Sequence, residues 1–224
     1  MNLAASEGSL GQLKPVNREV WIKRRPVTEV GRRIVGASVE EFAQKGILGA
    51  RVAEIAHRAG TTDPTFYRYF IGIKQAALFI MSEYYWTRLN VRLAHYLEVT
   101  KDPLRLFEAT VDALVQSSSD DPDYPWISES KVFQIVVAQM RNPALLPDSM
   151  MDSEYIGFLT KLENIIAIGQ KEKVFKSNLR PMLLSSLLIN SLNSLLVQKN
   201  IDYPIFKVDI SEVQQTARLI VGIG

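Results

Sequence analysis

The sequence predicts an all-α protein, and three observations support this fold class. Apolar residues recur at the spacing i, i+3, i+4 and i+7 along most of the 224 residues, which is typical of amphipathic helices. Gly, Pro and Asp residues stand where such helices would begin or end. No alternating pattern of comparable strength indicates a strand. We therefore expect a small N-terminal domain of three helices, followed by a larger helical domain.

The first three expected helices are short and lie close together in the sequence. One spans residues 33–45 and ends at Gly46, and the next spans residues 52–59 and ends at Gly60, because glycine commonly follows the last residue of a helix. Thr62 is a suitable N-cap for the third. Two short helices joined by a glycine-containing turn form a helix-turn-helix.

Longer helices are expected after this motif. A helix over 74–98 joins the two parts, and further helices are expected at 103–117, 127–140, 154–173, 181–199 and 211–223. The Ser-, Asp- and Pro-rich stretch 117–125 is expected to be a loop. The chain therefore divides into a basic arm (1–28), a helix-turn-helix domain (29–74) and a C-terminal domain (75–224).

Charge is divided unevenly between these parts. The net charge is +2, but residues 1–74 contain 12 Lys and Arg against 7 Asp and Glu, whereas residues 75–224 contain 14 against 17. The positive excess predicts that the first third of the chain faces a polyanion, for which nucleic acid is the leading candidate. The arm, which includes Lys23, Arg24 and Arg25, is expected to be flexible; a solubilising disordered tail is the alternative interpretation.

The sequence offers few residues from which a catalytic site could be built. It has no cysteine and two histidines, and it contains no glycine-rich phosphate loop, nucleophile elbow or zinc-protease motif. Glu54 and His57 form one Glu-x-x-His unit, but Arg92 stands where a second unit would need a glutamate before His95. We expect His57 to face solvent or phosphate, and we expect no enzyme, metal or cofactor.

Two further segments bear on location. Residues 182–198 are the most apolar stretch, but six Ser and Asn residues interrupt it, so we expect no membrane-spanning helix. The N-terminus lacks the basic start and apolar core of a secretory signal. A cytoplasmic location is expected.

Several fixed spacings within residues 30–80 match one known domain. The segments 33–46, 52–56, 59–60 and 65–70, together with Lys74, closely resemble the DNA-binding domain of the tetracycline-repressor (TetR) family. The resemblance implies a homodimer whose three N-terminal helices bind operator DNA and whose C-terminal domain dimerises and holds a small-molecule inducer. Nothing in residues 81–224 identifies that ligand.

The third helix is expected to enter the major groove of double-stranded DNA with its N-terminal residues. The residues expected near base edges are Thr62, Asp63, Pro64, Thr65 and Arg68, of which Arg68 is suited to guanine. Contacts to the DNA backbone are expected from Thr62, Tyr67, Tyr69 and Lys74, from Arg51, and from Lys23, Arg24 and Arg25 of the arm. The resemblance points to Tyr67 and Lys74 in particular.

Three positions depart from the family's pattern. Arg51 stands where a hydroxyl residue often caps the second helix, and Lys74 follows Phe70 by one residue more than is usual. Asp63 introduces a negative charge, which opposes phosphate attraction but can accept a hydrogen bond from a cytosine amino group, so we expect an unusual operator. Phe66 and Phe70 are interpreted as core residues rather than base contacts.

Two sites in the C-terminal domain are predicted from apolar side chains. The expected dimer interface consists of Leu184, Leu188, Leu195, Val213, Ala217 and Ile220; the alternative is that these residues form the core of one subunit. The expected ligand pocket is lined by Tyr85, Trp86, Phe107, Trp126, Phe133 and Phe158; the alternative is plain core or pocket rim. Because no charged cluster accompanies these aromatics, we expect a hydrophobic or aromatic ligand.

Together these features predict a homodimeric transcriptional repressor. A symmetric dimer presents two recognition helices to two half-sites, so we expect a palindromic operator that is released when a ligand occupies the C-terminal domain. Two alternatives stay open. One is a helical ligand-binding or stress-adaptor protein with a degenerate or non-specific DNA-binding domain, and the other is a ligand-dependent activator or nucleoid-type binder.

Overall fold

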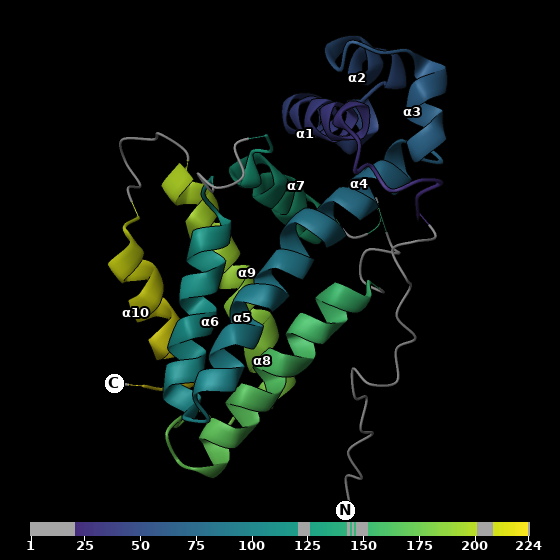
Figure 1. Cartoon of the computed structure of the whole chain (residues 1–224). Helices are drawn as coiled ribbons and strands as arrows, with labels where there is room; N and C mark the ends of the chain where they lie inside the picture. The colour runs from purple at the N-terminus through teal and green to yellow at the C-terminus, as the bar shows by residue number, and fades with distance from the viewer. Residues whose placement is uncertain are drawn as a thin grey trace, which may run out of the picture.

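The computed structural model describes residues 21–120, 126–142, 144, 146, 152–200 and 208–223. In these residues the regular structure is helical apart from isolated bridge residues, which include the antiparallel pair Ile22 and Phe70. Figure 1 shows a small N-terminal helical unit at one end of the molecule and a larger helical bundle beside it. The predicted all-α class, with a helix-turn-helix domain before a larger helical domain, is confirmed.

The small unit consists of α1 (Glu29–Gly49), α2 (Val52–Arg58) and α3 (Asp63–Tyr69). α1 begins earlier than predicted because Thr28 caps it, its hydroxyl oxygen accepting a hydrogen bond from the Gly31 N–H at 3.1 Å. Regular helix stops at Gly46 as predicted, since its φ of 68° lies in the left-handed region. Gly60, with φ 62°, makes the turn between α2 and α3.

One continuous helical rod leads from this unit into the bundle (Figure 1). It consists of α4 (Ile73–Met81), a π-helical turn η3 (Ser82–Trp86) and α5 (Thr87–Val99). The sequence predicts one helix over 74–98, and the π turn in its middle was not predicted. Such turns are frequent at functional sites.

The bundle contains α6 (Pro103–Ser117), α7 (Glu129–Arg141), α8 (Ser153–Lys171), α9 (Pro181–Asn200) and α10 (Ile210–Val221). Four of these helices begin at an N-cap whose side chain accepts a hydrogen bond from a backbone N–H: Asp102, Ser128, Asp152 and Asp209. These caps explain why the starts lie close to the predicted ones. Part of the predicted loop, residues 121–125, lies outside the described residues.

The apolar helix α9 is a core helix of the bundle. Residues Pro181–Gln198 are long and apolar enough to cross a membrane by length and composition, a test that buried helices also pass. In the structure α9 packs against α7, α8 and α10. Its side chains at Leu184, Leu188 and Leu192 are 0–2% exposed, so this face of α9 serves internal packing.

The residues predicted to form the dimer interface lie largely inside one subunit. Four of the six are no more than 2% exposed: Leu184, Leu188, Val213 and Ala217. The other two, Leu195 and Ile220, are partly buried against the same core. The interface prediction is wrong for the first four, and the alternative interpretation as core is correct. The cause is that α9 also carries leucines on its outward face, so apolar spacing alone does not identify the face that a partner covers.

Candidate DNA-binding surface and ligand cavity

α3 lies at the outer edge of the small unit, as Figure 1 shows, and its two faces differ in exposure. Phe66 is fully buried. The opposite face is exposed and consists of Thr62, Asp63, Pro64, Tyr67 and Arg68, which we call the reading face. Because these residues fall on one side of a short helix that follows a tight turn, the arrangement suits insertion into a DNA major groove.

An aromatic core holds α3 against the rod. The rings of Phe66 and Phe70 lie 5.5 Å apart, and those of Phe70 and Phe79 lie 5.7 Å apart. Phe66 and Phe70 are both 0% exposed, so their interpretation as core residues is correct. The reading face is therefore fixed relative to α4 by packed rings.

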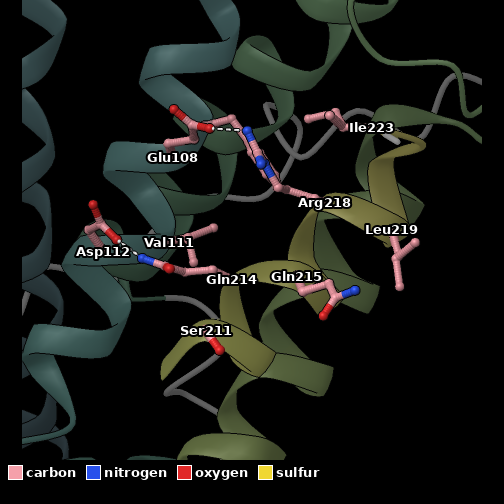
Figure 2. Close-up of a pocket in the computed structure, with 10 residues that line it drawn as sticks. Glu108, Val111, Asp112, Ser211, Gln214, Gln215, Arg218, Leu219 and Ile223 are labelled. Atoms are coloured by element: carbon pink, nitrogen blue, oxygen red, sulfur yellow. Dashed lines mark hydrogen bonds and ion pairs between the residues drawn. The ribbon is translucent and has the colours of Figure 1, made fainter. Parts of the chain in front are cut away.

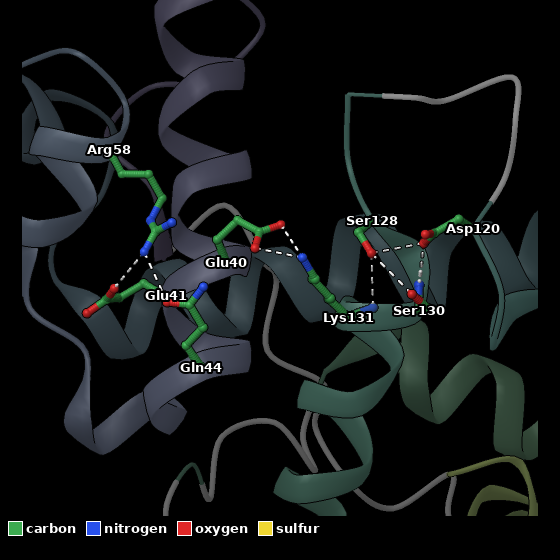
Figure 3. A network of polar contacts seen from close by, with 8 residues as sticks. All are labelled: Glu40, Glu41, Gln44, Arg58, Asp120, Ser128, Ser130 and Lys131. Carbon is green, nitrogen blue, oxygen red and sulfur yellow. Dashed lines mark hydrogen bonds and ion pairs between the residues drawn. The ribbon is translucent and has the colours of Figure 1, made fainter. Parts of the chain in front are cut away.

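A buried carboxylate joins α1 to α2. Glu41 is fully buried and lies 2.8 Å from the Lys45 ammonium and 3.7 Å from the Arg58 guanidinium, which also donates to Gln44 (Figure 3). A buried charge requires such partners. The contact fixes the position of α2, the helix that precedes the reading face.

The predicted positive contacts are exposed. Arg51 stands at the N-cap of α2 without making a side-chain cap, in keeping with its departure from the family's pattern, and Lys74 lies in the first turn of α4. Lys23, Arg24 and Arg25 are exposed as well.

Part of the predicted flexible arm is packed against the small unit. Trp21 is 3% exposed, and the Lys23 N–H donates to the Tyr69 carbonyl at 2.7 Å. Pro26 lies so close to Gly31 that a Cβ on this glycine would stand 2.6 Å from the proline backbone. Residues 21–28 are thus held beside the end of α3, unlike a flexible arm, and residues 1–20 lie outside the described residues.

Tyr69 does not lie on the reading face. Its side chain is 5% exposed, and its hydroxyl makes a 2.6 Å hydrogen bond with the hydroxyl of Thr28. The predicted phosphate contact is wrong in this arrangement because Tyr69 follows Phe66 by three residues and shares its inward face. Thr62 occupies the N-cap position as predicted, but its hydroxyl pairs with that of Thr65 at 3.1 Å instead of capping the helix.

A polar contact bridges the small unit and the bundle, as Figure 3 shows. The Lys131 ammonium of α7 lies 2.6 Å from both carboxylate oxygens of Glu40 in α1. Nearby, Asp120 accepts hydrogen bonds from the Ser128 hydroxyl at 2.9 Å and the Ser130 N–H at 3.0 Å. These bonds order the start of α7, which carries Lys131.

Aromatic and charged contacts complete this junction. Trp126 packs edge-on against Tyr84 with ring centroids 5.3 Å apart, and the Arg32 guanidinium lies 5.9 Å from the Trp126 ring centre. Arg25 lies 3.6 Å from the Glu83 carboxylate. Burial and the Glu83 charge raise the pKa of Tyr84 to about 12, so its hydroxyl stays neutral. Trp126 therefore belongs to the domain junction and not to a ligand pocket as predicted.

A cavity of about 190 Å³ lies between the rod and the bundle. Its apolar wall consists of Leu78, Met81, Trp86, Val136, Met140 and Tyr155, and its polar wall of Gln139, Asp152, Ser186 and Asn190. Two of these residues, Met81 and Trp86, flank or end the π turn. Asp152 accepts a hydrogen bond from the Ser82 hydroxyl at 3.1 Å, which ties the cavity wall to the first residue of that turn.

A second, more open groove of about 600 Å³ runs between α6 and α10 (Figure 2). Two contacts cross it: Arg218 to Glu108 at 2.7 Å, and Gln214 to Asp112 at 2.9 Å. The helix α10, which borders this groove, lies farther from the small unit than α4 does, as Figure 1 shows. Since it borders neither α4 nor η3, we regard the smaller cavity as the candidate ligand site.

The six aromatic residues predicted to line one pocket are distributed over several places. Trp86 lines the cavity. Tyr85, Phe133 and Phe158 are at most 2% exposed and form core around it, while Phe107 lies against the open groove. The prediction that these six residues line one pocket is therefore wrong. The reason is that aromatic side chains in a helical bundle fill the core as readily as they line cavities.

The polar residues of the cavity were not predicted from the sequence. In the sequence, Ser186 and Asn190 are two of the six polar residues that interrupt the apolar segment 182–198, and nothing in the local pattern indicates a binding role for them. Asp152 stands two residues before the expected helix 154–173, and the capping character of aspartate is the signal that the sequence offers. Its place beside the rod depends on contacts between residues 70 positions apart, which no local pattern contains.

Comparisons with known proteins agree with this architecture. Residues 34–77 match the family model of bacterial regulatory proteins, tetR family. No curated protein gives a match in sequence. The fatty acid degradation regulator FadR from Bacillus halodurans is a similar solved structure, with a TM-score of 0.65 and 20% identity over 85% of this chain and 93% of that one.

Two more solved structures contain ligands. FadR from Bacillus subtilis, in complex with stearoyl-CoA, has a TM-score of 0.67 and 17% identity over 86% of this chain and 98% of that one. AibR, in complex with isovaleryl coenzyme A and operator DNA, has a TM-score of 0.65 and 12% identity over 87% and 98% of the two chains. At these identities the likeness shows the shared fold.

The exposed α3, the glycine turn before it and the helical bundle behind it define a helix-turn-helix DNA-binding protein with a second helical domain. Residues 34–77 assign the N-terminal domain to the tetR family of bacterial regulatory proteins. The resemblance found in the sequence is confirmed, and the chain is a DNA-binding transcriptional regulator.

Proposed function

We propose that this regulator is a homodimeric repressor that binds a palindromic operator and leaves it when a small ligand fills the cavity. The observation that carries the proposal is the single helical rod that connects the exposed α3 unit to the cavity wall. Regulators of the same fold are described with stearoyl-CoA, and with isovaleryl coenzyme A together with operator DNA, which supports a small organic effector here. Because a bacterial regulator of this kind binds chromosomal DNA, the proposed function includes a cytoplasmic location.

The residues of the reading face have separate roles in this proposal. Arg68 reads a base edge, for which guanine offers two acceptors, and Asp63 accepts from a cytosine amino group. Tyr67, which is 43% exposed, and Lys74 contact phosphates and so fix the position of α3 on the duplex.

Dimerisation follows from the need to contact two half-sites. The outward face of α9 carries Leu183 and Leu187, each 41% exposed, and we propose that a second copy covers them. Two copies of α3 must then lie about 34–36 Å apart, or a multiple of that distance, to enter major grooves on the same side of the DNA.

The π turn is the proposed connection between ligand and DNA. Ser82 bonds to Asp152 in the cavity wall, Tyr84 packs on Trp126 at the junction, and Trp86 lines the cavity. A ligand that binds more tightly to a different placement of the rod shifts the population away from the DNA-binding arrangement, and DNA reciprocally weakens ligand binding.

The test is the salt dependence of DNA binding by the purified protein, on duplexes that it recovers from a random-sequence pool. Lys74→Ala is expected to weaken binding and to reduce the slope of log K against log salt by about one, because one phosphate contact is lost. Lys171→Ala is the matched control, since Lys171 is an exposed lysine in the last turn of α8, outside the helix-turn-helix unit. Equal slopes for the wild type and Lys74→Ala would contradict the proposed DNA-binding surface.

A further inference from the structure

Two asparagines of the described residues are buried in the bundle, and their amides differ in what they contact. Asn90, which is 6% exposed, donates to the Glu154 backbone carbonyl at 2.7 Å and to the Glu154 carboxylate at 3.1 Å, and it accepts from Lys161 at 2.7 Å. Asn193 is 2% exposed, and its Oδ1 has no hydrogen-bond partner among the described residues. Its Nδ2 lies 3.3 Å from the sulfur of Met140, which is a weak acceptor.

The unpaired amide of Asn193 requires an explanation. Buried polar groups are nearly always hydrogen-bonded, and a buried amide that has lost water without gaining a partner destabilises the fold. An apolar side chain of similar volume, such as leucine, would avoid this cost. The amide is explained if a molecule that enters the bundle pairs with it.

Asn193 lies next to the candidate ligand cavity. It follows Ser186 by seven residues and Asn190 by three, so the three side chains fall on one face of α9, and the first two line the cavity. Met140, which contacts Asn193, is also part of the cavity wall. A methionine side chain is unbranched and adapts to irregular space. Movement of this one side chain would connect the cavity with the Asn193 amide.

Cavity size and shape restrict the rest of the ligand. A volume of about 190 Å³ is smaller than the 300–1,000 Å³ of sites that hold drug-sized ligands, so a compact molecule is required. The rings of Trp86 and Tyr155 form part of the wall with centroids 4.7 Å apart, and they offer apolar surface to an aromatic ring.

We propose that Asn193 selects the ligand of this cavity. When the Met140 side chain turns aside, the Asn193 amide pairs with an uncharged group that both donates and accepts a hydrogen bond, such as a primary carboxamide. Oδ1 accepts from the ligand N–H and Nδ2 donates to the ligand carbonyl, so both ends of the amide gain a partner. An ionised group is a poorer match, because an amide has no net charge to balance it. This inference rests on the proposed function, in which a ligand fills the cavity.

Three probes of nearly the same shape test the proposal: benzamide, acetophenone and α-methylstyrene, titrated into the full-length protein by ligand-observed NMR. Benzamide has a donor and an acceptor, acetophenone has an acceptor alone, and α-methylstyrene has neither. Asn193→Leu is expected to weaken benzamide about tenfold and acetophenone less, and to leave α-methylstyrene unchanged or tighter. Each probe is compared with itself, so its hydration cancels. Asn164→Leu, at an exposed position of α8, is the control and is expected to change none of the three affinities.

The stability of the same variants separates a binding role from a structural one. Asn193→Leu is expected to leave the melting temperature unchanged or to raise it, because an unpaired amide is removed. Asn90→Leu is expected to lower it by about 5 °C, because three hydrogen bonds are lost. Asn193→Leu as unstable as Asn90→Leu would show that the Asn193 amide serves the fold, and would overturn the proposal.

A second variant tests the role of Met140 with the asparagine in place. Met140→Ala is expected to bind benzamide more tightly than the wild type, because no side chain has to move from the amide. The proposal is overturned if Met140→Ala does not strengthen benzamide binding, if Asn193→Leu weakens all three probes equally or none of them, or if none binds the wild type.

Operator binding separates this inference from the proposed function. If benzamide binds through Asn193 but leaves operator affinity unchanged, the ligand class stands and ligand-induced release fails. If a probe weakens operator binding through this cavity equally in the wild type and in Asn193→Leu, release stands and the ligand class fails.

Discussion

α3 and α9 show opposite relations between sequence pattern and surface. In α3 the apolar and polar residues lie on different faces. Phe66 is on the buried apolar face, and Arg68 is on the exposed polar face. In α9 leucines occur on both faces: Leu184 is buried and Leu187 is 41% exposed. The spacing of apolar residues therefore identifies the exposed face of a helix that has one apolar face. It does not identify the exposed face of a helix with apolar residues on all sides.

The largest expected effect comes from the buried face of α3. Phe66→Ala removes a fully buried ring and is expected to lower the free energy of unfolding by about 3–5 kcal/mol, because a cavity is left. Urea denaturation followed by circular dichroism measures it. Tyr67→Ala, on the exposed face, is expected to weaken DNA binding while changing the stability far less. Similar losses of stability for the two variants would remove the distinction between the faces.

The two faces of α9 are separated by a pair of leucine variants. Leu184→Ala is expected to cost about 2–5 kcal/mol of stability, because Leu184 is 0% exposed within one subunit. Leu187→Ser is expected to leave the subunit folded and to shift the dimer toward monomer in sedimentation experiments. Since dimer stability depends on concentration, both variants are compared with the wild type at equal concentration. A dimer unaffected by Leu187→Ser would place the interface elsewhere.

A smaller effect on stability is expected at the junction. Lys131→Met removes the contact with Glu40, whose side chain is 33% exposed, and is expected to change the free energy of unfolding by no more than about 1 kcal/mol. It is expected to reduce the factor by which an effector weakens operator binding, because α7 then holds α1 less firmly. Arg105→Met, which removes an exposed contact with Asp102, is the control. If an effector weakens operator binding by the same factor in Lys131→Met as in the wild type, the contact between Lys131 and Glu40 has no part in the coupling between ligand and DNA.

The smallest effect concerns acid stability. Burial raises the pKa of Asp120, but hydrogen bonds from the Ser130 N–H and the Ser128 hydroxyl outweigh it, so the pKa lies below the usual value. The folded state is therefore favoured above the unfolded-state pKa of about 3.9, and the contribution is lost as the pH falls through the folded-state pKa. Asp120→Asn is expected to be less stable than the wild type at neutral pH and to approach it in acid, as denaturation at several pH values would show. A constant difference would contradict this.

The sequence predicts the fold more completely than the sites. Glycines such as Gly46 and Gly60, and caps such as Asp102, act on neighbouring residues, so helix ends follow from local pattern. The exposed face of α3 follows for the same reason. The prediction for Tyr69 is wrong although its spacing of three residues from Phe66 already indicates the inward face; there its hydroxyl bonds to Thr28, 41 residues away. The cavity likewise depends on distant contacts, and no local pattern reveals them.

The central claim is that a dimer of this chain reads two DNA half-sites with α3. The most direct measurement is the selection of bound duplexes from a random-sequence DNA pool by the purified full-length protein, followed by sequencing. The account predicts an inverted repeat whose half-site centres lie about 10–10.5 base pairs apart, or a multiple of that. Salt-sensitive binding that enriches no sequence, or no binding at all, would contradict it.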